Sequence, residues 1–199
     1  MTEQGKWQTL GPALLILALV VMLFASHILP YTQFSEPTIN ESYTIELVAE
    51  DLGGPSCLEW ADANVLIVCD RDDGRLVALH FDFNETDSEW NLSSSSTWLD
   101  GFFQPHGIHF DEDFIIISDS GRLTRINHSG PDSVWMDEVQ TNERWVLIEG
   151  VSVGNHQTNA INEMPNGTLI WHVGSTCNIC VEDDERNAAL LWVNASTSE

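Results

Sequence analysis

Basic residues are scarce in this chain: seven Lys and Arg stand against 31 Asp and Glu in 199 residues, a formal net charge of -24. A surface of this sign repels the phosphate backbone, so the composition excludes nucleic acid as a partner. A sustained helical period is also absent after residue 30, which argues against a helical bundle. An apolar fraction of 43% still provides enough material for a packed core.

Long hydrophobic runs are missing except at residues 10–29, which are nearly all apolar. About 20 residues span a bilayer as a helix, whereas the apolar region of a secretory signal is about 7 to 15 long. The small-x-small cleavage pattern is also imperfect, because Leu23 stands where a small residue is expected before Ala25. We favour an uncleaved transmembrane anchor over a cleaved signal peptide.

Four segments follow from this interpretation. Lys6 precedes the apolar run and Arg71 is the next basic side chain, so the positive-inside rule places residues 1–9 in the cytoplasm. Residues 10–29 form the anchor, residues 30–43 are a polar tether, and residues 44–199 are the folded domain on the outside. The sequence therefore predicts a single-pass membrane protein with an extracellular domain, a location that the glycosylation sequons also fit. The sequons begin at Asn40, Asn84, Asn91, Asn127, Asn166 and Asn194.

The folded domain is predicted to be all-β. Short apolar runs, such as residues 64–68, 114–118 and 169–173, alternate with clusters of Asp, Asn, Gly and Ser. The run of serines within residues 92–98 is interpreted as a loop between units. The motif beginning at Pro55 recurs at Pro105, 50 residues later, and a third unit follows after the same interval.

A period of about 40 to 50 residues with several strands per unit is typical of propeller blades. Chance spacing among ordinary β-hairpins is the alternative. Three units are fewer than the roughly four to eight blades of a closed propeller. We therefore interpret the sequence as the N-terminal part of a longer protein, with assembly from two halves as the weaker alternative.

The four cysteines are expected to form two disulfides, the default in an oxidising compartment. A turn centred near Ala63 would place Cys57 opposite Cys69 across a hairpin, with two reduced core cysteines as the alternative. Cys177 and Cys180 form a Cys-x-x-Cys pair without the His that haem attachment requires and without a set of zinc ligands. A short disulfide pinning the acidic loop that follows is the best fit, and no metal-binding residues are assigned.

His106 and His156 lie 50 residues apart, at what the repeat predicts to be the start of inner strands. An imidazole is a suitable base for taking a proton from a hydroxyl at neutral pH, and the polar side chains of Asn155, Gln157 and Asn159 could orient a polyol. Bonding of each histidine within a strand end is the alternative.

The third unit resembles the glucose/sorbosone dehydrogenase family, which are six-bladed propeller quinoproteins. The resemblance rests on His156, Asn159, the Gly-Ser-x-Cys-Asn-x-Cys motif of residues 174–180, Glu182 and Arg186. The second unit, from Pro105-His106-Gly107 to Gly121-Arg122-Leu123, is similar to the preceding blade of the sorbosone branch.

This resemblance implies about three blades of six, and oxidation of a sugar or polyol hydroxyl by pyrroloquinoline quinone (PQQ) with calcium. It places His156 in the role of the base, with His106, Gln157 and Asn159 as substrate-binding candidates. The family's cofactor clamp and calcium site come mostly from later blades, and the sequence names neither the substrate nor the electron acceptor. A non-catalytic extracellular propeller that binds carbohydrate or protein is the alternative function.

Overall fold

The structure is a computed structural model that describes residues 46–86, 88–130 and 134–195. The chain divides into two compact units, residues 1–47 and 48–199, and the fold below is that of the second. The predicted cytoplasmic segment 1–9, anchor 10–29 and tether 30–43 lie outside the described residues and remain predictions. Among the helices of the described part, none has the length and apolarity needed to cross a membrane.

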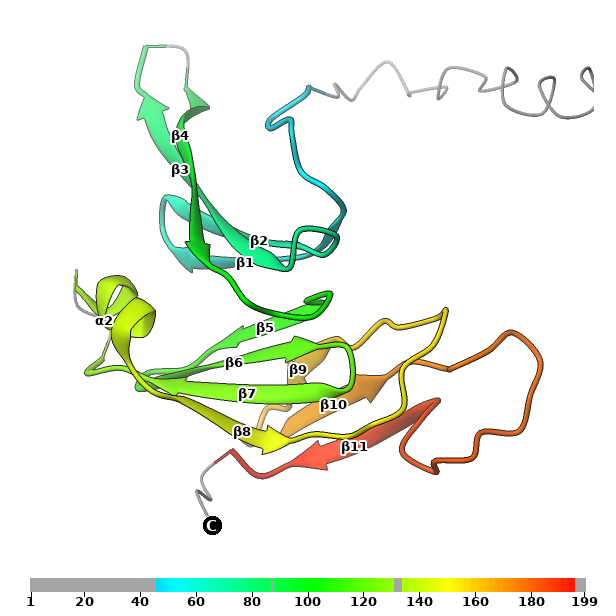
Figure 1. The fold of residues 1–199 in the computed structure, drawn as a ribbon. Helices are drawn as coiled ribbons and strands as arrows, with labels where there is room; N and C mark the ends of the chain where they lie inside the picture. Colours follow the sequence, from blue (N-terminus) through cyan, green and yellow to red (C-terminus); the bar gives the residue numbers. More distant parts are fainter. Residues whose placement is uncertain (1–45, 87, 131–133, 196–199) are drawn as a thin grey trace, which may run out of the picture. The chain divides into compact units, whose positions relative to one another are not determined.

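Three antiparallel sheets follow one another along the chain (Figure 1). Each sheet adds its strands in sequence order, as the blades of a propeller do. The prediction of an all-β partial propeller is confirmed, with a third blade of three strands in the described residues. The strands are β1 Pro55–Asp62, β2 Val65–Asp70, β3 Arg75–Asn84 and β4 Glu89–Leu99; β5 Gly107–Phe110, β6 Phe114–Asp119, β7 Arg122–Asn127 and β8 Arg144–Ile148; β9 Ile161–Glu163, β10 Leu169–Val173 and β11 Ala189–Val193.

The second blade is sandwiched between the other two, and strand β6 shows why its sequence is apolar at almost every position. Ile115 and Ile117 pack into a core shared with the first blade, while Phe114 and Ile116 pack into a core shared with the third. Successive side chains of a strand point to opposite faces, so a strand buried on both sides needs a continuous apolar run.

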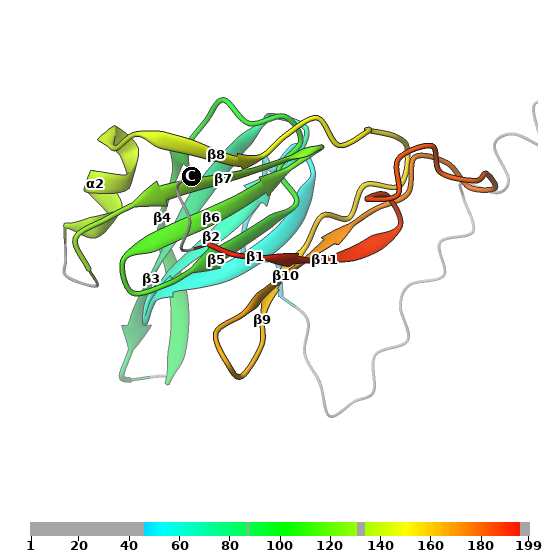
Figure 2. The ribbon, with the colours of Figure 1, turned by 90° about the horizontal axis from the view of Figure 1, so that it is seen from below.

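Two elements differ from the sequence prediction. The serine-rich stretch forms part of β4, whose Ser93–Ser96 segment is exposed and pairs with β3. Backbone pairing needs no apolar side chain, so an exposed outer strand resembles a loop in sequence. The other element is helix α2, Trp135–Thr141, which precedes β8 (Figure 2). Seven residues with only Trp135 and Val139 buried are too few to show a helical period.

The predicted hairpin disulfide is present. Cys57 and Cys69 are register partners on β1 and β2, and their sulfur atoms are bonded. We expect the Cys57→Ser, Cys69→Ser double variant to lose about 3 kcal/mol of unfolding free energy, because the bond closes a short loop in the unfolded chain. Urea denaturation of the two proteins measures this difference, and an unchanged midpoint would contradict it.

Candidate functional site

A polar cavity of about 200 Å³ lies where the connections into the second and third blades meet. His106 directly precedes β5, and Arg71 directly follows β2. In an antiparallel hairpin, the start of the first strand and the end of the second lie at the same end. His106 and Arg71 therefore lie at the same end of their respective blades. The lining residues are Arg71, Gln104, His106, Gly154, Asn155 and Gln157.

His106 is held firmly within this site. Its backbone N–H donates to the carbonyl of Ser118 at 2.8 Å, and its side chain is only 8% exposed. The imidazole Nε2 is buried and has no hydrogen-bond partner among the described residues. Burial lowers the pKa of His106, and the positive charge of Arg71 lowers it further, whereas Asp119 acts in the opposite direction. The lowered pKa favours the neutral imidazole at pH 7, and Nε2 is the ring nitrogen left open to a ligand.

Gln157 lies in the same cavity and is oriented by Asn159. The side-chain amide of Asn159 donates to Gln157 Oε1 at 3.1 Å and to the carbonyl of Asp119 at 3.2 Å. The Oδ1 atom of Asn159 accepts the N–H of Gly174, and the residue is fully buried. Gln157 Nε2 is left without a partner among the described residues. Asn159 thus positions Gln157, and Gln157 offers a donor to a ligand.

Close backbone packing beside the cavity depends on Gly107. A Cβ atom added there would lie 2.6 Å from the carbonyl oxygen of Asn159, so β5 and the segment leading to β9 can approach only because residue 107 is glycine. This approach brings His106 and Gln157 into one cavity.

His156 lies between two lining residues, Asn155 and Gln157, but does not itself line the cavity. It is exposed, is not among the residues lining the cavity, and forms an isolated bridge with Ser175. Strand β9 begins at Ile161, five residues after His156, so the prediction that both histidines start an inner strand is correct for His106 and wrong for His156. The connection before the third blade, residues 149–160, is longer than the one before the second, residues 100–106, and a fixed 50-residue offset does not allow for this.

Three of the lining residues were not among those expected from the sequence: Arg71, Gln104 and Gly154. Arg71 belongs to an acidic turn and forms a 2.8 Å ion pair with Asp72. Its position just after a second strand was a usable signal, because the end of a second strand and the start of a first strand lie at the same end of their blades. The positive φ of Gln104, 52°, was not readable from the sequence.

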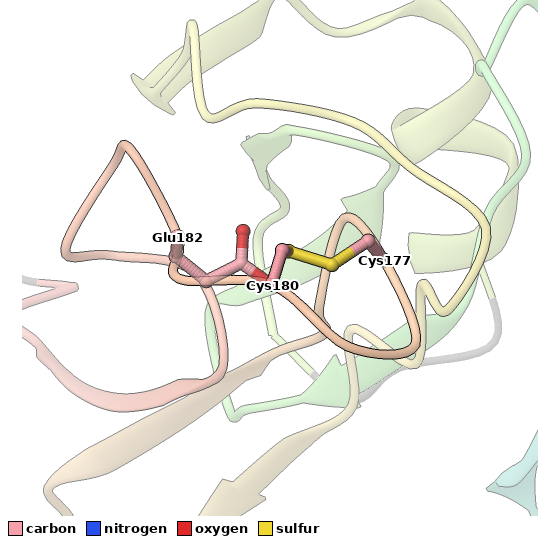
Figure 3. Close-up of side chains that lie close together, drawn as sticks. All are labelled: Cys177, Cys180 and Glu182. Atoms are coloured by element: carbon pink, nitrogen blue, oxygen red, sulfur yellow. A yellow bond between two sulfur atoms is a disulfide. The ribbon is translucent and has the colours of Figure 1, made fainter.

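Cys177 and Cys180 form the predicted second disulfide, in a loop that does not line this cavity. The carboxylate of Glu182 accepts from Thr176 N–H at 2.9 Å and from the Ser175 and Thr176 hydroxyls, and it points back toward the cysteines (Figure 3). The hydroxyl donors lower the pKa of Glu182. Although the two sulfur atoms and the carboxylate lie within 4.8 Å of one another, oxidised cysteines are not metal-binding thiolates. The disulfide and the hydrogen bonds of Glu182 stabilise the conformation of this loop.

The pKa of His106 predicts a pH dependence of stability. Because the folded-state pKa lies below the unfolded value of about 6.5, folding favours the neutral form, and this contribution is complete above pH 6.5. It is lost as the pH falls below 6.5 toward the folded-state pKa. We expect His106→Gln to flatten the fall in unfolding free energy between about pH 7 and 5, as measured by urea denaturation at each pH. Identical slopes for the variant and the wild type would contradict this.

No protein-family model and no curated protein sequence matches this chain. Solved structures with the same fold do exist. A Trichoderma reesei protein of Carbohydrate-Active Enzymes Family AA12, solved in iodide and calcium forms, superposes with a TM-score of 0.53 at 14% identity. The holo form of the PQQ domain of Coprinopsis cinerea pyranose dehydrogenase superposes with a TM-score of 0.51 at 21% identity.

Each of these matches covers 66% of this chain but only 30–33% of the other. The chain thus spans about a third of the structures that it resembles. At such identities the likeness shows the fold alone, a partial β-propeller.

Proposed function

We propose that this chain is part of a quinoprotein-type dehydrogenase that oxidises a hydroxyl group of a sugar or polyol. The observation that supports this best is the partnerless Nε2 of the buried, neutral His106 in a cavity that also carries Arg71 and Gln157. Oxidation of an alcohol to a carbonyl removes a proton from oxygen and a hydride from carbon. His106 Nε2 accepts the proton.

The donors of the cavity fit the oxygen atoms of PQQ. Gln157 Nε2 supplies an N–H group without a partner among the described residues, and Arg71 supplies a guanidinium that is also paired with Asp72 at 2.8 Å. None of the lining residues is acidic. When bound, the quinone accepts the hydride. A cavity of about 200 Å³ is smaller than most small-molecule sites, so these residues contact only part of the cofactor.

Calcium does not fit the described residues of this cavity. Calcium takes six to eight oxygen ligands, mostly carboxylates and carbonyls, and none of the lining side chains is acidic. In this proposal the ion is held by parts of the protein beyond these three blades.

The proposal is tested by dye-linked oxidation of a sugar panel by the full-length protein reconstituted with PQQ and calcium. Turnover that depends on both the quinone and His106 would support it. Quinone-independent activity, or none with any sugar, would count against it and favour a propeller that only binds its ligand.

A further inference from the structure

The glycosylation sequons in the described part of the chain gather at one end of the blades. Neighbouring strands of each sheet are antiparallel, so a strand position fixes the end at which a residue lies. All five asparagines lie at the end of their blades opposite to the one at which His106 precedes β5, and the arrows of β7 and β11 point toward this end in Figure 1. They are Asn84 at the end of β3, Asn91 near the start of β4, Asn127 at the end of β7, Asn166 in the turn between β9 and β10, and Asn194 directly after β11.

Asn166 stands at the tip of the hairpin formed by β9 and β10, in a tight turn. The N–H of Gly167 donates to the carbonyl of Met164 at 2.9 Å, and Gly167 has a φ of 80°. Asn166 is exposed, and its Oδ1 accepts the N–H of Thr168 at 3.1 Å. Its Nδ2 has no hydrogen-bond partner among the described residues. The turn therefore leaves the amide nitrogen, the atom to which an N-linked glycan is attached, open to an enzyme.

Two other sequons have their third residue engaged by the protein. The hydroxyl of Ser129, in the Asn127 sequon, donates to the carboxylate of Glu138 at 2.9 Å. The hydroxyl of Ser93, in the Asn91 sequon, donates to a backbone carbonyl of β3 at 3.0 Å. The third-position hydroxyl belongs to the acceptor motif, so these bonds withhold part of the motif in the folded domain. The structure thus separates Asn166 from two sequons that look equivalent in the sequence.

The position of the turn also keeps it clear of neighbouring blades. The blades of a propeller pack through the faces of their sheets, whereas the hairpin turns lie at the ends of the strands. A further blade packed on the outer face of the third sheet would cover side chains of its strands. The turn at Asn166 would remain in contact with solvent.

We propose that Asn166 carries an N-linked oligosaccharide. The proposal rests on the predicted extracellular location and not on the dehydrogenase function. In the transfer, Asn166 Nδ2 forms a bond to C1 of the first sugar of a lipid-phosphate-linked oligosaccharide. The bond between C1 and the phosphate oxygen breaks, the lipid phosphate leaves with the electron pair, and the amide nitrogen loses one proton to solvent. The glycan covers this end of the blades, so ligands and partners approach from the end that carries the His106 cavity.

Peptide mapping by mass spectrometry of the full-length protein from its natural source tests the site. The peptide that contains Asn166 is expected to be heavier by the mass of an oligosaccharide. In variants made in the same cells, Asn166→Gln and Thr168→Ala should lose this mass completely, whereas Thr168→Ser should retain it because the motif is kept. Asn162→Gln is the matched control: Asn162 is exposed on β9 of the same hairpin but begins no sequon, so the glycan should remain.

Two results would overturn the proposal: an unmodified Asn166 in the natural protein, or an added mass that survives Asn166→Gln and therefore lies on another residue of the peptide. Circular dichroism checks that the variants fold. Turnover of Asn166→Gln should match the wild type, because the turn lies at the other end of the blades from His106. A glycosylated protein without turnover would overturn the dehydrogenase proposal alone, and an active protein with an unmodified Asn166 would overturn the glycan alone.

Discussion

Replacing His106 by alanine is expected to lower turnover by about 10²- to 10⁴-fold, the usual contribution of a positioned general base. The imidazole is buried with a lowered pKa, and its Nε2 has no partner among the described residues, so alanine removes the proposed acceptor of the hydroxyl proton. Steady-state oxidation of a sugar by the reconstituted protein measures the loss. Binding of the quinone should change far less than turnover, because Arg71 and Gln157 remain.

His156→Ala is the control for this prediction and also a test of the assignment made from sequence. His156 is exposed and does not line the cavity, so we expect turnover close to that of the wild type. If His156→Ala lost activity while His106→Ala kept it, the base would be His156 and the cavity would have another role.

Trp171→Ala is expected to destabilise the domain by about 3–5 kcal/mol, in the range found for large aromatic residues removed from a core. Trp171 is fully buried between the second and third blades, and its indole N–H donates to Ser118 Oγ at 2.8 Å. Alanine would leave both a cavity and an unsatisfied hydroxyl. Urea denaturation, followed by circular dichroism, measures the change.

Trp192→Ala provides the comparison for Trp171→Ala. Trp192 is 68% exposed, so its loss should cost less than about 1 kcal/mol. Equal losses for the two variants would mean that the third blade is not packed against the second as described.

The strands and the disulfide between Cys57 and Cys69 could be predicted because their signals are local. Apolar runs separated by turn residues mark strands, and a tight hairpin fixes which residues face each other. The continuous apolar run of residues 114–117 also indicates a strand buried on both faces, and Ile115 and Ile116 do lie in different cores.

The site was less predictable because it depends on how separate blades meet. The structure brings His106 and Gln157 to one cavity, whereas His156 is not among the residues that line it. Asn159 was expected to touch the substrate, whereas its hydrogen bonds are directed at Gln157, Asp119 and Gly174. Such contacts join residues from different blades, and no local pattern encodes them.

The most direct test of the account is a single-turnover experiment in which a sugar is added to the full-length protein loaded with PQQ and the absorbance of the quinone is followed. The account predicts rapid reduction in the wild type and in His156→Ala. In His106→Ala the quinone should bind but be reduced at least about 100-fold more slowly. Equal rates of reduction in His106→Ala and the wild type would contradict the account.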